Sequence, residues 1–121
     1  MPAQDHYISL KEAVEMTTTF RENRETILAD DYKETNVLAQ CETLDKEALR
    51  AFMDNEYCKS IRLYSGMNND LQVKTILVGV NENAEDMIEG AQVVLPLVDK
   101  SARTPPHSVP QSVLNSQVND L

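Results

Sequence analysis

Hydrophobic and polar positions alternate along residues 59–80 in two runs that are separated by a polar loop. In the first run the alternation gives one apolar and one polar face, which is the pattern of a half-buried strand. The two faces carry Ile61 with Leu63 and Arg62 with Tyr64. The second run becomes apolar on both faces from Ile76 to Val80, and the polar residues 68–70 favour a turn between the runs. The central segment is therefore predicted to be a β-hairpin.

Apolar residues near the N-terminus recur at three- and four-residue spacing, which predicts a long amphipathic helix over residues 9–29. Ser9 and Glu12 match the capping box, in which two side chains satisfy free backbone donors at the start of a helix. The helix is expected to begin at Ser9 and to end near Ala29. The residues at helical spacing are Leu10, Ala13, Val14, Thr17, Phe20, Arg24, Ile27 and Leu28.

Two shorter elements are expected between this helix and the hairpin. Residues 36–42 have the length and composition of a strand, although the alanine and glutamine among them weaken the pattern. Residues 44–54 show an apolar stripe at helical spacing, and either Thr43 or Asp45 can cap the helix that they predict. This second helix is short, at about three turns.

The chain changes in composition after the hairpin. Residues 87–88 and 92–98 are expected to supply one or two further short strands, and Pro96 favours an edge position for them. From Asp99 onward the sequence is rich in Ser, Pro, Asn and Gln. Residues 99–121 are therefore predicted to be an extended arm or a disordered tail.

Together these elements predict an α+β fold with an antiparallel sheet centred on the hairpin at about 59–80. The long N-terminal helix at about 9–29 and the short second helix at about 44–54 are expected to pack on this sheet. A chain of 121 residues is the usual size of one domain. The expected organisation is a single α+β domain over residues 1–98, followed by the arm or tail at 99–121.

The net charge of −9 narrows the range of partners. Residues 1–58 carry 13 acidic and 6 basic side chains, and residues 59–121 carry 7 and 5, so the N-terminal part is the more acidic. Phosphate binding needs clustered Lys and Arg, and the closest pairs, such as Arg21 with Arg24, are flanked by acids. Neither nucleic acid nor a membrane surface is an expected partner.

The sequence also indicates in which cellular compartment the protein is expected. No signal-peptide pattern opens it, and no apolar run reaches the ~20 residues that a membrane span needs. A soluble cytoplasmic protein is expected, although a mature secreted form that has lost its signal peptide is also compatible. Cys41 and Cys58 are too few and too far apart for a disulfide framework or a zinc site, so they are interpreted as small buried hydrophobes.

Residues with catalytic or ligating chemistry are few. His6 and His107 lie in the terminal segments, where a nucleophile–histidine pair would need a terminus to fold back over the domain. The polar run from Asn81 to Glu89 echoes the alternating oxygen ligands of a calcium loop. A β-turn explains it better, because the glycine of such loops is missing at the sixth position. No catalytic residue, metal site or cofactor is predicted.

Arg62 and Tyr64 form the most informative polar pair in the sequence. Both are expected to project from one face of a central strand, where a charged group needs a partner or water. They are candidates to line a subunit contact or a pocket between sheet and helix, with Met67 on the rim of that pocket. The alternatives are a solvent-exposed face, or an ion pair of Arg62 with a helix carboxylate such as Glu15 or Glu22.

Four segments, taken in order, resemble a family of small uncharacterised bacterial proteins. They are ISLKEAVEMTTTFRENRETIL, CETLDKEAL, SIRLYSGMNNDLQVKTILVGVNENAEDM and RTPPHSVPQSVLN, and they lie within residues 8–115. The shared features are a capped helix running into MTxxFR, strands with YxGM and LVGV, and a proline-rich tail closing in Ser-x-Leu-Asn. The family's tail commonly carries two cysteines where this chain has Thr104 and Ser108, so no metal or redox role is carried over. The resemblance implies a coherent fold and no particular activity.

Three classes of function are compatible with these patterns. The favoured one is a non-enzymatic interaction or scaffold module, because the sequence supports a shape and no catalytic chemistry. The alternative is a small-molecule binding or sensing domain with a pocket near Arg62 and Tyr64. An enzyme is the least favoured. The expected partner is a second copy of the chain, as a homodimer, or another protein, because the two-sided apolar run Ile76 to Val80 needs a cover on both faces.

Overall fold

The computed structural model describes residues 6–88, 101–106 and 108–115. The chain forms two compact units, of which one comprises Met1–Cys41 with Arg103–Leu121 and the other Glu42–Ala102. The described residues contain helices and two two-stranded sheets, which confirms the predicted α+β class. The predicted division into a domain at 1–98 and a tail stays a prediction.

In the first unit, helix α1 (Leu10–Asn23) begins where the sequence predicts. The Ser9 hydroxyl accepts a hydrogen bond from the backbone N–H of Glu12 at 3.0 Å. The same hydroxyl donates to the Glu12 carboxylate at 3.2 Å. One of the free N–H groups of the first turn is thus satisfied by a side chain, and an acidic residue lies at the positive end of the helix dipole.

The helix is shorter than predicted, since it ends at Asn23 and not near Ala29. The Asn23 side-chain amide donates to the Thr19 carbonyl one turn earlier in the helix, at 2.8 Å. Glu22 and Glu25 put negative charge at the end of the helix where the dipole is also negative. This unfavourable charge opposes extension of the helix to the end of the apolar periodicity.

The strand predicted at residues 36–42 is confined to β1 (Cys41–Thr43). A short 3-10 helix, η2 (Asp30–Tyr32), is followed by residues in turns and bends. Glu34 and Asn36 have positive φ angles of 63° and 59°. Such angles are incompatible with a strand, so the composition of this segment gave the wrong start for the extended structure.

Strand β4 (Ala102–Thr104) pairs with β1 and lies in the segment that the sequence predicts as an arm or tail. Arg103 in this strand is buried. One of its guanidinium nitrogens, Nη2, donates to the carbonyls of Asn36 at 2.9 Å and Val37 at 3.2 Å. These bonds hold β4 against the loop that precedes β1.

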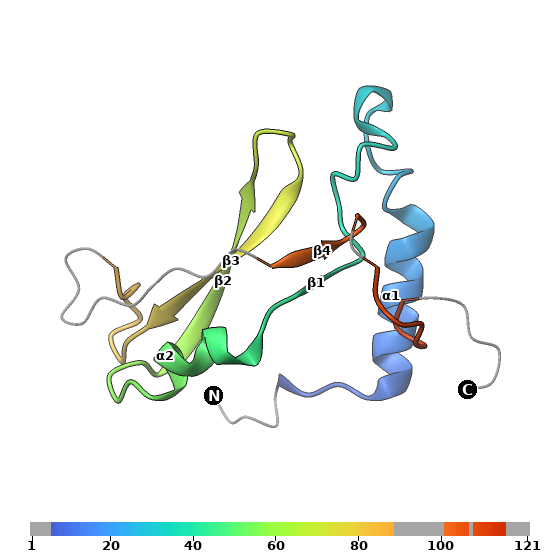
Figure 1. Ribbon diagram of the computed structural model, residues 1–121. Coiled ribbons are helices and arrows are strands. Elements are labelled where there is room, and N and C mark those ends of the chain that lie inside the picture. The colour runs from blue at the N-terminus through green and yellow to red at the C-terminus, as the bar shows by residue number, and fades with distance from the viewer. Residues whose placement is uncertain (1–5, 89–100, 107, 116–121) are drawn as a thin grey trace. The chain divides into compact units, whose positions relative to one another are not determined.

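In the second unit, β2 (Ser60–Met67) and β3 (Val73–Val80) form the predicted antiparallel hairpin, which Figure 1 shows as the pair of long arrows. The Asn68 carbonyl accepts from the N–H of Leu71 at 3.0 Å, and the Asn68 N–H donates to the Gln72 carbonyl at 3.1 Å. Leu71 has a φ of 61°. This is a three-residue hairpin loop with a left-handed third residue, so Leu71 belongs to the loop and not, as predicted, to the second strand.

The helical segment predicted at residues 44–54 is present in two parts. A 3-10 helix, η3 (Lys46–Leu49), leads directly into the single-turn helix α2 (Arg50–Met53). Of the two caps that the sequence offered, Asp45 is used, because its carboxylate accepts from the N–H of Glu47 at 3.0 Å. The segment begins and ends close to the predicted positions.

Strand β3 is buried on both faces towards its end, with Val78 and Val80 on the face of Arg62 and Leu77 on the other. The largest buried cluster of this unit lies on the face of Leu77. Phe52 of α2 packs there against Leu77 of β3 and Met87, which is 1% exposed. Residues opposite each other in an antiparallel pair share a face, so Leu63, the partner of Leu77, belongs to the same face. The partly buried hydrophobic residues around this cluster are Leu44, Leu49, Ala51, Cys58 and Ile61.

The chain turns back along β3 after the hairpin. Asp86 forms an isolated antiparallel bridge with Val80, and the N–H of Met87 donates to the Gly79 carbonyl at 2.8 Å. Residues 87–88, which the sequence predicts as a strand, are therefore not in one. The strand predicted at 92–98 lies outside the described residues.

Candidate functional site

Arg62 and Tyr64 share one face of β2, as predicted, and both contact Asp86. A guanidinium nitrogen of Arg62, Nη1, lies 2.6 Å from Oδ1 of the Asp86 carboxylate. The Tyr64 hydroxyl donates to Oδ2 of the same carboxylate at 2.5 Å, and Arg62 Nη2 donates to the Ala84 carbonyl at 3.3 Å. The partner of Arg62 is thus Asp86, and not a helix carboxylate such as Glu15 or Glu22, which was one of the alternatives from the sequence.

The contacts of Arg62 favour its charged form. Hydrogen bonding with Tyr64 raises the pKa of the Arg62 guanidinium above its ordinary value. Partial desolvation opposes this rise, while hydrogen bonding and charge attraction to Asp86 add to it. The side chains of Arg62 and Asp86 are 40% and 22% exposed, so water screens their attraction. The cluster is therefore a neutralised polar contact at the surface of the hairpin.

The loop between β3 and Asp86 sets the position of the carboxylate. The Asn81 side-chain oxygen accepts from the N–H groups of Asn83 at 2.9 Å and Glu85 at 3.1 Å. Ala84 has a φ of 64°, which lets the chain reverse before the bridge of Asp86 with Val80. The turn predicted from the polar residues here is confirmed. Asp86 itself was missed, although an acid soon after the strand that pairs with Arg62 is a signal that the sequence contains.

Met67 lies on the opposite face of β2 from Arg62 and Tyr64. It pairs with Val73 at the loop end of the hairpin, and 58% of the residue is exposed. Successive residues of a strand alternate between the two faces, so residues 62 and 64 share a face that residue 67 does not. The three predicted site residues are therefore not brought together around one pocket.

The outer edge of β2 is defined here as the side that faces away from β3. Among the residues that the structure describes, β2 pairs with β3 alone. The Gly79 carbonyl accepts from Met87, so it points away from β2, and Gly79 is not hydrogen-bonded to Ile61 opposite it. Hydrogen-bonded and non-bonded pairs alternate along an antiparallel ladder. The residues of β2 with outward N–H and C=O groups are therefore Ile61, Leu63, Ser65 and Met67.

Apolar side chains accompany this edge. Leu63 is 67% exposed, although it lies on the face that carries the largest buried cluster. It lines an apolar groove of about 320 Å³ together with Thr75 and Leu77 of β3. The remaining described residues of the groove are Glu42, Leu44 and Ser101. The outer edge thus adjoins a recess that can take an apolar side chain.

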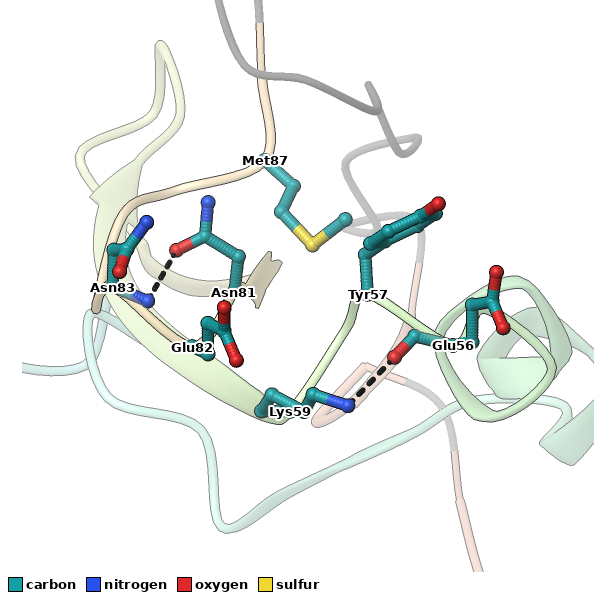
Figure 2. Close-up of a pocket in the computed structure, with 7 residues that line it drawn as sticks. All are labelled: Glu56, Tyr57, Lys59, Asn81, Glu82, Asn83 and Met87. Carbon is teal, nitrogen blue, oxygen red and sulfur yellow. Dashed lines mark hydrogen bonds between the residues drawn. The ribbon is translucent and has the colours of Figure 1, made fainter.

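A second recess of about 390 Å³ lies where the start of β2 meets the loop after β3, and Figure 2 shows its lining. Tyr57 and Met87 supply apolar surface beside each other. The Lys59 ammonium group donates to the Glu56 carbonyl at 2.8 Å. The residues of the loop that complete the lining are Asn81, Glu82 and Asn83. This is a mixed polar and apolar cavity whose residues the sequence did not indicate as a site.

Other residues with possible site chemistry are dispersed. Within residues 6–88, 101–106 and 108–115, no group of three or more His, Cys, Asp or Glu side chains is placed to hold a metal ion. Cys41 and Cys58 are free and half-buried, and His6 is exposed. His107 and Glu89 lie outside the described residues. No helix in the described part of the chain is long and apolar enough to cross a membrane.

Comparison with known proteins gives no match from which a function could be inferred. The chain matches no model of a known protein family, no curated protein and no solved structure. The resemblance to a family of small uncharacterised bacterial proteins therefore stays a prediction from the sequence. The edge of β2, the cluster at Asp86 and the two recesses are the features from which a function can be proposed.

Proposed function

We propose that the protein is a non-enzymatic interaction module that binds an extended segment of a partner along the outer edge of β2. The observation that carries this proposal is the row of outward backbone groups at four alternate positions of β2. An uncovered strand edge offers N–H donors and C=O acceptors at the spacing of another strand. Addition of a strand to such an edge is a common mode of peptide recognition.

The side chains at this edge support the same mode. In strand addition the backbone bonds supply affinity, while pockets for alternate side chains supply specificity. The groove beside Leu63 is a pocket of this kind, and exposed Met67 provides a second apolar contact on the same face. The hairpin is suited to receive a third strand, because two strands alone are only marginally stable in water.

The edge also lacks the features with which proteins block unwanted pairing. Natural edge strands are commonly protected by Pro, by Lys, by bulges or by short length. Strand β2 has eight residues without Pro or Lys, and all eight pair in register with β3. Its one charged residue, Arg62, is held by Asp86. An unprotected edge of this length is consistent with a strand that pairs with a partner.

A selection of random peptides tests the proposal. Peptides that bind the immobilised full chain are compared on two variants, Ser65→Pro and Ser65→Ala. Proline removes the outward N–H of Ser65 without removing a donor to β3, and alanine keeps that N–H. We expect selected peptides to bind Ser65→Ala as they bind the original chain, and to bind Ser65→Pro about tenfold more weakly.

A control is needed to show that the variants still fold. Thermal unfolding of both variants shows whether the hairpin is retained, and Leu63→Lys serves as a second edge variant that leaves every backbone donor in place. Failure to select any peptide, or peptides that bind Ser65→Pro and Leu63→Lys with undiminished affinity, would overturn the proposal.

A second candidate is binding of a small polar molecule, which the recess of about 390 Å³ in Figure 2 favours. Its volume is within the usual range of ligand sites. The predicted pocket near Arg62 and Tyr64 has less support, because the polar ends of both side chains are engaged by Asp86. A thermal-shift screen of metabolites tests this candidate, with Tyr57→Ala as the matched variant. Equal shifts in the original chain and in Tyr57→Ala would count against the recess.

A further inference from the structure

We infer that the partner at the outer edge of β2 is β2 of a second copy of this chain. The result is a two-fold symmetric dimer in which the two hairpins form one four-stranded antiparallel sheet. The inference rests on the proposed function, because it names the partner of the same edge. A strand paired with its own copy about a two-fold axis buries the same patch on both subunits, which is the commonest kind of closed assembly.

The geometry of β2 selects one register for this pairing. Outward groups must meet outward groups, so each of the four outward residues has to face another of the four in the second copy. All four find partners when the two-fold axis passes through Tyr64, with Ile61 opposite Met67 and Leu63 opposite Ser65. Every outward N–H and C=O of β2 then has a partner across the interface.

This register also suits the side chains on both faces. Tyr64 faces Tyr64 of the second copy at a non-bonded position, and its hydroxyl can stay on Asp86 because that contact lies on the β3 side of the strand. Arg62 faces Gly66 of the second copy, which has no side chain, so Arg62 can stay on Asp86. A register centred on Arg62 would instead place two guanidinium groups opposite each other. On the other face, the exposed side chains of Leu63 and Met67 are partly covered.

The charge of the chain favours this strand over the rest of the surface. A net charge of −9 opposes the approach of two copies wherever acidic side chains meet. Strand β2, SIRLYSGM, carries no acidic residue, and its one charged residue, Arg62, is paired with Asp86 of the same chain. Long-range repulsion remains between the two subunits, so added salt is expected to strengthen the dimer by screening it. A contact made of ion pairs would weaken instead.

Size-exclusion chromatography with light scattering of the full chain tests the dimer. We expect a mass of twice 13.6 kDa for the original chain and for Ser65→Ala, and a monomer for Ser65→Pro. Raising the salt concentration should shift a partly dissociated sample towards the dimer. A strict monomer at high concentration, a dimer unaffected by Ser65→Pro, or a dimer that salt dissociates would each overturn the inference.

Cysteine cross-linking tests the register. Opposite Cβ atoms at a non-bonded pair lie about 4.5–5.5 Å apart, close to the reach of a disulfide. Under mild oxidation we expect Tyr64→Cys to form a covalent dimer in high yield. Ser65→Cys faces Leu63 of the second copy, so it should not exceed the background given by Cys41 and Cys58. Equal cross-linking at both positions, or none at Tyr64→Cys, would overturn the register.

The two proposals fail in distinguishable ways. A monomeric chain that still binds selected peptides through Ser65 overturns the second copy as partner and leaves the interaction module standing. A monomeric chain that selects no peptide overturns both. A dimer that is lost in Ser65→Pro, with the covalent link at Tyr64→Cys, supports both and identifies the partner.

Discussion

The two strands of the hairpin have the same length and are paired along all eight residues, yet they differ in burial. The clearest comparison is a pair of identical residues. Leu63 of β2 and Leu77 of β3 lie directly opposite each other on one face, and they are 67% and 8% exposed. Both residues are leucines and they are paired in the sheet, so the difference in their exposure comes from what covers each strand.

The cover lies over β3. Phe52 and Met87 pack on Leu77, and the segment at Asp86 pairs with the far edge of β3 at Val80. Strand β2 has no second neighbour among the described residues. The difference indicates a division of roles, in which β3 supplies the stability of the hairpin and β2 carries the edge that we propose as the binding surface.

The largest expected effect comes from shortening the covered leucine. Leu77→Ala removes buried methyl groups from the contact with Phe52 and Met87 and leaves a cavity. We expect a loss of about 3 kcal/mol in the free energy of unfolding. Urea denaturation at low protein concentration, where association does not contribute, measures it.

Leu63→Ala is the matched control for this experiment. The same atoms are removed at an exposed site, so the free energy of unfolding should change by no more than about 0.5 kcal/mol. Association through the outer edge of β2 should weaken instead. Equal losses in the free energy of unfolding for Leu77→Ala and Leu63→Ala would show that the two strands do not differ in their contribution to stability.

A smaller effect is expected at the cluster that joins the strands to the following loop. Asp86→Asn removes the charge that Arg62 contacts at 2.6 Å and weakens the acceptor of the Tyr64 hydroxyl. The loss should be smaller than for Leu77→Ala, because water can reach Arg62. It should also shrink at about 1 M salt, where charges are strongly screened. Asp70→Asn, an exposed change of the same kind in the hairpin loop, is the control in parallel urea titrations.

The pH dependence of this contact follows from the direction of its pKa shift. Hydrogen bonding, chiefly with Tyr64, raises the pKa of Arg62 in the folded state above its value in the unfolded chain. Its contribution to stability is then complete below the unfolded value and lost only as the pH rises through the folded one. Titration of Arg62 should therefore not alter stability around neutral pH. A loss of its contribution between slightly acidic and slightly basic solution would point to another titrating group.

Much of this hairpin could be predicted from the sequence, because its determinants are local. The alternation of apolar and polar residues predicts which side chains share a face of β2. By the same rule Met67, at an odd-numbered position, lies on the opposite face from Arg62 and Tyr64. The capping box at Ser9 is local in the same sense. The predicted site itself stays a prediction, in which Met67 lies on the other face of β2 from Arg62 and Tyr64.

The remainder depends on contacts between segments distant in sequence. Asp86 reaches Arg62 only because the chain reverses after β3 and pairs with Val80. Asn36 takes a positive φ, which composition did not indicate. Which strand of the hairpin has a second neighbour depends on the same reversal, because the segment at Asp86 pairs with β3 at Val80.

The smallest expected effect concerns the helical segment whose Phe52 covers Leu77. Glu47 accepts from Arg50 Nε at 2.7 Å and Nη2 at 3.1 Å. Hydrogen bonding to Arg50 lowers the pKa of Glu47 from its ordinary value of 4.5, and slight desolvation opposes the shift. A lowered pKa in the folded state stabilises the fold above pH 4.5, and this contribution is lost as the pH falls through the folded value.

Glu47→Gln should therefore lower the Tm slightly at neutral pH and leave it unchanged in acid, after the carboxyl is protonated. The effect is small because both side chains are more than half exposed. Glu22→Gln, an exposed change on α1, controls for the altered net charge. A difference that grew as the pH fell would mean that Arg50 does not hold Glu47 in the folded state. The cover over β3 would then depend on Asp45 and on packing at Phe52, and the contrast between the strands would rest on apolar contacts alone.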